Sequence, residues 1–139
     1  MKFYASIIIL AFLVACISKS PKQQEEKSAG ITTVSFEEEM HNFGQLQAGE
    51  IVVYTFVFIN TGETNLTINN TETDCGCVQV NVPEHTIKPG DKGRIEVEFD
   101  SSGLIGRQLK TIEIHANSKE PKQLVIFAEV KNEQIEINS

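Results

Sequence analysis

The chain has 139 residues, 40% of them hydrophobic and 22% charged, which is the composition of a single soluble globular domain. Its 12 basic and 19 acidic side chains give a formal net charge of −7, and the basic residues are scattered along the sequence. A nucleic-acid partner is not expected, because binding to a phosphate backbone requires a clustered basic patch.

The N-terminal segment, residues 1–15, has the pattern of a secretory signal peptide. Lys2 precedes a mostly apolar run from Phe3 to Ala15, which is shorter than the about 20 residues that a helix needs to span a bilayer. The run ends in Leu13-Val14-Ala15-Cys16, which resembles the bacterial lipobox, where a peptidase cuts before the cysteine and the cysteine then carries the lipid. We predict a lipoprotein signal peptide and lipidation of Cys16. The alternative is a signal anchor that is never cleaved, with an unmodified cysteine.

The segment that follows the predicted cleavage site is polar. Beyond the cysteine, residues 16–30 consist mainly of Ser, Lys, Gln, Glu, Pro and Gly, a composition that buries too little surface to fold, so we predict a tether. Removing residues 1–15 removes one basic side chain, Lys2, which leaves 11 basic and 19 acidic side chains and a net charge of −8. An anionic lipid surface would repel such a domain, so we expect the lipid on Cys16 to be its link to the membrane.

From Ile31 onward, short apolar runs alternate with turn signals, a pattern typical of β-strands. The most apolar run, 51–59, is expected to be a central strand, and Asn60-Thr61-Gly62 is expected to turn after it because Asn and Gly accept positive φ angles. The alternation changes between Leu109 and Ile112, which predicts a bulge. In chain order the predicted strands cover residues 34–43, 51–59, 65–73, 77–82, 94–99, 108–117 and 123–130.

These strands, with no helical pattern outside the signal peptide, predict an all-β fold. We predict a single immunoglobulin-like β-sandwich of about seven strands at residues 31–131, followed by a C-terminal tail at 132–139. The Cys-Trp-Cys arrangement of antibody domains is missing, since the chain has no Trp and its two domain cysteines, Cys75 and Cys77, are separated by a single residue.

Several short motifs occur in the order in which a known bacterial family has them. They are Phe43-Gly44, Asn60-Thr61-Gly62, Cys75-Gly76-Cys77 and Pro89-Gly90, within stretches that cover roughly residues 36–130. On these motifs the chain resembles the bacterial domain of unknown function numbered 1573, although Thr73-Asp74 and Val78 flank the cysteines where that family favours Ser and Thr. The resemblance implies an Ig-like sandwich related to the major-sperm-protein and Hydin-type domains, on lipoproteins of Bacteroidetes-like bacteria, with no established activity.

Cys75-Gly76-Cys77 could be a structural feature, a metal site or a redox pair. An exported protein permits a disulfide, and a bond across so short a ring is expected to be easily reduced, as thiol exchange requires. Two thiolates suit copper(I), whereas zinc would need further ligands such as His41, His85 or His115 from distant strands. In the structural interpretation the cysteines line a turn in which Gly76 supplies backbone freedom. That interpretation is favoured, and the metal and redox alternatives stay open.

The sequence contains no nucleophile elbow, no His-Glu-x-x-His motif and no phosphate loop, so we expect a non-enzymatic protein without a cofactor or a small-molecule substrate. Our main hypothesis is a lipid-anchored binding or assembly module of the bacterial cell envelope, on its periplasmic face or outer surface, whose strand edges contact an envelope protein. Glu37-Glu38-Glu39 is interpreted as an acidic edge that discourages strand pairing. The alternative hypothesis is a copper-binding or thiol-redox envelope protein that uses Cys75 and Cys77, assisted by His85.

Overall fold

The computed structural model of the protein describes residues 30–132. The predicted signal peptide, the lipidation site Cys16 and the tether up to residue 29 lie outside these residues, as does the tail from residue 133. Within the described part of the chain, no helix is long and apolar enough to cross a membrane.

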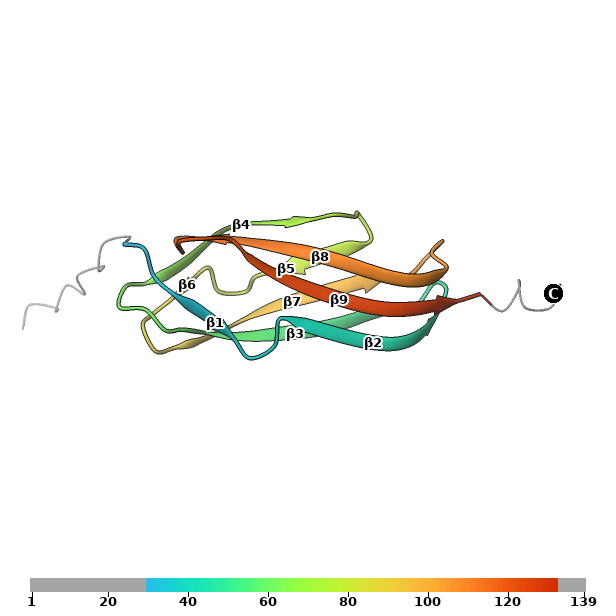
Figure 1. The fold of residues 1–139 in the computed structure, drawn as a ribbon, viewed down its shortest axis with the longest axis horizontal. Helices are drawn as coiled ribbons and strands as arrows, with labels where there is room; N and C mark the ends of the chain where they lie inside the picture. Colours follow the sequence, from blue (N-terminus) through green and yellow to red (C-terminus); the bar gives the residue numbers. More distant parts are fainter. Residues whose placement is uncertain (1–29, 133–139) are drawn as a thin grey trace, which may run out of the picture.

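Two β-sheets pack face to face (Figure 1). The first sheet has the strand order β1-β3-β7-β5 and the second has the order β2-β9-β8-β4-β6. The prediction of an all-β sandwich is confirmed. The nine strands of the described residues are β1 (Val34–Phe36), β2 (Met40–Gln47), β3 (Ile51–Asn60), β4 (Leu66–Thr73), β5 (Val78–Asn81), β6 (Thr86–Ile87), β7 (Lys92–Asp100), β8 (Gly106–Ala116) and β9 (Lys122–Lys131).

The strands outnumber those expected because one predicted strand divides and one short strand is added. The strand predicted at 34–43 leaves the first sheet after Phe36 and enters the second sheet at Met40, so it forms both β1 and β2. The crossover between them is Glu37-Glu38-Glu39, whose side chains are exposed. Strand β1 pairs antiparallel with β3, whereas β2 pairs parallel with β9. The added strand, β6, pairs with β4 over two residues.

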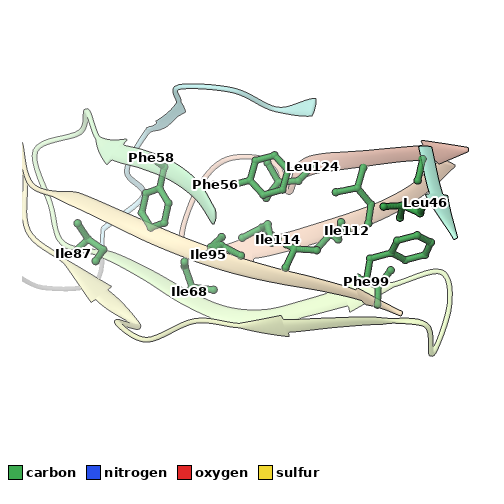
Figure 2. Packing of buried hydrophobic residues seen from close by; sticks show 14 of the residues in the cluster. Leu46, Phe56, Phe58, Ile68, Ile87, Ile95, Phe99, Ile112, Ile114 and Leu124 are labelled. Atoms are coloured by element: carbon green, nitrogen blue, oxygen red, sulfur yellow. The ribbon is translucent and has the colours of Figure 1, made fainter. Parts of the chain in front are cut away.

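The core lies between the sheets and consists of the inward-facing side chains of each strand. Alternation places the even-numbered residues of β3 and the odd-numbered residues of β7 in the interior. Phe56, Phe58 and Phe99 are the largest of the fully buried side chains. Figure 2 shows the packed cluster, in which Phe56, Ile95, Ile112, Ile114 and Leu124 are among the labelled residues. Each fully buried side chain of this kind contributes about 1.5–3 kcal/mol to stability.

The prediction of a bulge in β8 is wrong. The ladder between β8 and β9 runs from Gly106 to Ile114 without a shift in register. Leu109 breaks the expected alternation because it points outward, where it is 59% exposed and pairs with Phe127 of β9. The irregularity in this part of the sheet lies instead on β4, between Ile68 and Asn70.

Candidate functional site

The cysteine motif forms the link between the two sheets from β4 to β5. Cys75 and Cys77 are joined by a disulfide with a Cα–Cα distance of 5.2 Å. Both cysteines are half-buried, Cys77 packs against the core, and Gly76 between them is exposed. The φ angle of Gly76 is not positive and a Cβ there would meet no atom within 4 Å, so the expectation that its backbone freedom is required is not supported.

Hydrogen bonds fix this link at both ends. The Thr73 hydroxyl donates to the Cys75 carbonyl at 3.2 Å, and the Asp100 N–H of β7 donates to the Cys77 carbonyl at 2.9 Å. Asp74 accepts a hydrogen bond from the Thr111 N–H of β8 at 3.2 Å. The disulfide is therefore part of a well-connected crossover between the sheets.

The described residues contain no group of three or more His, Cys, Asp or Glu side chains arranged to hold a metal ion. The three histidines lie in different places. His41 stacks on the Tyr54 ring at a centroid distance of 3.5 Å, and His115 lies 3.1 Å from a Glu113 carboxylate oxygen. His85 is exposed, with its Nδ1 3.3 Å from the Ile68 carbonyl oxygen. None of them joins the cysteines in such a group, so the described residues do not supply the additional ligands that zinc would need, and the two-ligand copper(I) alternative is not tested by this observation.

Asn60 of the Asn60-Thr61-Gly62 motif is a buried anchor rather than a flexible turn residue. Its side chain is fully buried and its Nδ2 donates to the carbonyl groups of Thr64 and Ile87 at 2.8 and 2.9 Å. Its Oδ1 accepts hydrogen bonds from the Thr32 hydroxyl at 2.9 Å and from the Gly62 N–H at 3.1 Å. Every polar atom of the amide is satisfied, so the side chain joins three segments of the backbone.

The predicted reason for the glycine of this motif is also wrong. No non-glycine residue among those described has a positive φ, and Gly62 is not among the glycines that do. A Cβ on Gly62 would instead lie 1.9 Å from the Thr32 hydroxyl oxygen and 2.7 Å from the Thr33 nitrogen. Gly62 is required because another segment of the chain passes too close for any side chain.

A second asparagine acts in the same way near the same end of the sandwich. Asn117 donates from its Nδ2 to the Gly30 and Asn65 carbonyl groups, at 2.7 and 2.8 Å, and its Oδ1 accepts from the Thr67 N–H at 2.7 Å. Together Asn60 and Asn117 fasten the start of the domain to both sheets. Asn60, Gly62 and Asn117 therefore maintain the fold.

Among residues 30–132, no strand pairs with β3 along part of one side. Strand β3 pairs with β7 over nearly its whole length, from Ile51 to Ile59, but on its other side β1 covers only Phe58 to Asn60. The last hydrogen bond on that side runs from the Glu37 N–H to the Val57 carbonyl at 3.0 Å. We call this side of residues 51–57 the open edge of β3. The strand is central in the sheet order, as predicted, yet its N-terminal half is an edge.

The open edge presents unused backbone groups and apolar side chains. In an antiparallel strand the N–H and C=O of one residue point to the same side, and the side alternates along the chain. Since the Val57 carbonyl faces β1, the backbone groups of Val53 and Thr55 face the open edge, where no other strand of the described residues covers them. The side chains of Ile51 and Val53 point out of the sandwich and are 59% and 57% exposed.

The acidic crossover lies at the end of the open edge. Glu37 forms an ion pair with Lys92, and Glu38 accepts a hydrogen bond from the Tyr54 hydroxyl at 2.8 Å. This hydrogen bond, followed by burial and the negative charges of Glu38 and Glu37, raises the pKa of Tyr54. Glu39 is exposed. The sequence indicated this acidic edge through its run of three glutamates, but it did not reveal which strand is left uncovered there.

The motifs and the sandwich agree with a comparison against protein families. The model of the family DUF1573, described as a protein of unknown function, matches residues 34–130. The chain belongs to the DUF1573 family. The family resemblance predicted from the sequence is confirmed, and the motif residues of this DUF1573 domain are now seen as fold anchors and a disulfide crossover. A search of curated proteins yields no match.

Solved structures share the fold at low sequence identity. A protein of unknown function from Porphyromonas gingivalis W83 has a TM-score of 0.64 and 18% identity; the match covers 78% of this chain and 51% of that one. The ASH/PapD-like domain 7 of human CEP192 has a TM-score of 0.57 and 11% identity, covering 91% and 99% of the two chains. The E. coli chaperone DraB has a TM-score of 0.53 and 11% identity, covering 72% and 56%. The chain thus spans about half the length of the Porphyromonas protein, and these similarities establish the fold alone.

Proposed function

We propose that this DUF1573 protein is a lipid-anchored, non-enzymatic binding module of the bacterial cell envelope, which takes up an extended segment of a partner protein at the open edge of β3. The observation that carries the proposal is the unpaired half of β3, where the N–H and C=O groups of Val53 and Thr55 face outward. An added strand would satisfy these groups through main-chain hydrogen bonds, as in β-strand addition generally.

The anchoring part of the proposal rests on the sequence. The apolar segment before Cys16 and the match of Leu13-Val14-Ala15-Cys16 to a lipobox support export and lipidation. A lipid at the N-terminus would hold the domain at a membrane and leave its sides available to other envelope proteins. Mass spectrometry of the mature protein from membranes would test this part, since it predicts a chain that starts at a diacylated or triacylated Cys16.

Crosslinking in living cells would test the proposed edge. A photoreactive amino acid replacing Val53 is expected to give a discrete adduct. Thr55→Pro should abolish this adduct, because proline removes an N–H that faces the open edge. The fold should tolerate proline at this position, because β7 does not use the Thr55 N–H. Thr55→Ala is the matched control, which keeps the N–H and should keep the adduct. An adduct that survives Thr55→Pro in a folded protein, or no adduct from Val53, would contradict the proposal.

Thiol–disulfide exchange is a second candidate function, favoured by the Cys75–Cys77 disulfide in a half-exposed crossover. The reduced pair would also offer two thiolates to copper(I). Native mass spectrometry of the reduced protein with copper(I), together with equilibration against glutathione, would test both chemistries. A protein that binds no copper and whose disulfide does not exchange would leave Cys75 and Cys77 with a structural role.

A further inference from the structure

The open edge of β3 is long enough for a short strand and is bounded at both ends. It runs from Ile51, which follows the β2–β3 turn, to Val57, where the Glu37 N–H bond closes it. At about 3.3 Å per residue, this is a slot for an extended segment of about five to seven residues. A partner strand would place its outward side chains beside Ile51, Val53 and Thr55, which favours β-branched or apolar residues there.

Carboxylates surround both ends of this slot. Glu37, Glu38 and Glu39 form the crossover at the Val57 end, where Lys92 forms an ion pair with Glu37, while Arg94, which pairs with Val57 in the β7 ladder, lies 3.8 Å from a Glu96 carboxylate oxygen. At the other end lies Glu50, at the turn before Ile51, whereas Asp100, which pairs with Ile51, lies on β7 on the opposite side of β3.

This arrangement of charge disfavours a second copy of the chain as the occupant. Two copies related by a two-fold axis would pair their open edges antiparallel, so the Val57 end of one would lie beside the Ile51 end of the other. The crossover carboxylates of each copy would then lie near Glu50 of its neighbour. Like charges placed directly opposite are destabilising, and the net charge of −7 adds to the repulsion.

We infer that the open edge of β3 selects an extended partner segment with alternating β-branched residues and a Lys or Arg at the end that meets Glu38 and Glu39. The free backbone groups provide the docking site, and the carboxylates select the charge of the partner. This inference rests on the proposed function, because it names the class of partner for the same edge.

Synthetic peptides would test the inference on the mature chain, residues 16–139 with Cys16→Ser. The probe is acetyl-Lys-Val-Thr-Val-Thr-Val-Lys-amide, and the comparison peptides carry Glu or Gln in place of both Lys residues. Binding would be followed by NMR through hydrogen exchange of the Val53 and Thr55 amides, which we expect to be unprotected in the free protein because no strand of the described residues pairs with them on the open side. We expect the Lys peptide to protect both amides, the Glu peptide to protect neither, and added salt to weaken the binding.

Charge-removing variants provide the matched control. Glu38→Gln with Glu39→Gln should weaken binding of the Lys peptide by about fivefold, since exposed ion pairs are individually weak. Glu72→Gln with Glu120→Gln removes the same charge outside the slot, since Glu72 lies on β4 of the second sheet, and should leave the affinity unchanged. Glutamine at position 38 can still accept a hydrogen bond from the Tyr54 hydroxyl, so the edge keeps its shape.

Each contrary result has a distinct meaning. Equal protection by all three peptides would overturn the basic partner and leave strand addition intact. No protection by any peptide would overturn the inference together with the proposed function. Protection of Val53 and Thr55 in the free protein, rising with protein concentration alongside dimers in sedimentation, would assign the edge to a second copy and overturn the inference.

Discussion

Replacing Asn60 with alanine tests whether the Asn60-Thr61-Gly62 motif serves the fold. Its fully buried amide makes four hydrogen bonds, with Thr32, Gly62, Thr64 and Ile87, and alanine loses all of them. At about 0.5–1.5 kcal/mol each, four bonds contribute about 2–6 kcal/mol, and we expect a loss of about 4 kcal/mol. This is a large part of the about 5–15 kcal/mol that stabilises a typical domain.

Urea unfolding, followed by circular dichroism, would measure this loss of stability. We expect a lower midpoint urea concentration and an unchanged dependence of the unfolding free energy on urea concentration. Thr61→Ala is the control, because its hydroxyl makes only an exposed hydrogen bond to Thr33 and should change stability by no more than about 0.5 kcal/mol. Asn60→Asp should be at least as damaging as alanine, since a buried carboxylate would face two carbonyl groups. A loss below about 1 kcal/mol for Asn60→Ala would refute the anchoring role.

Three further predictions concern the Tyr54 hydroxyl, the Cys75–Cys77 disulfide and the lipid predicted on Cys16. The raised pKa of Tyr54 means that its protonated hydroxyl stabilises the fold below the unfolded value of about 10, and that this contribution is lost as pH rises through the folded pKa. Urea titrations between about pH 9 and pH 11 should therefore show a weaker pH dependence for Tyr54→Phe, and equal slopes would contradict the contact with Glu38. Replacing Cys75 and Cys77 with serine should cost no more than about 2 kcal/mol in the same assay, because the bond closes a very short loop; a larger cost would mean that the crossover depends on it. Cys16→Ser should move the protein from the membrane to the soluble fraction, and a variant still in the membrane would refute lipid anchoring.

The sequence was sufficient for the sandwich because alternation of apolar and polar residues directly reports which side chains face a core. It failed where alternation was interrupted for another reason. Leu109 points outward against Phe127, so an exposed apolar pair imitated the signal of a bulge. The division of the strand at 34–43 was not predicted, because apolar periodicity says which face is buried and not which neighbour a strand pairs with.

The candidate site was predicted only in part, for related reasons. Spacing alone suggested the disulfide between Cys75 and Cys77, while its place as a crossover between sheets depends on long-range pairing. Local propensity assigned Asn60 to a turn. It could not reveal the anchoring role, because one of the backbone carbonyls that the Asn60 amide binds belongs to Thr64 and the other to the distant Ile87. The open edge of β3 could not be found from one segment, since it exists only where β1 departs.

The pairing of β2 with β9 has a consequence for the order in which the domain can form. The second strand of the fold lies beside the last one, and Thr32 bridges to Ser118 in the same parallel sense. A chain that leaves the ribosome or a membrane channel N-terminus first therefore cannot close its core until residues 122–131 have emerged. Pairings this distant in sequence fold slowly, on the scale of about milliseconds to seconds. Until then β2 and β8 both expose edges, so this protein is vulnerable to misassembly for as long as its last ten-residue strand is missing.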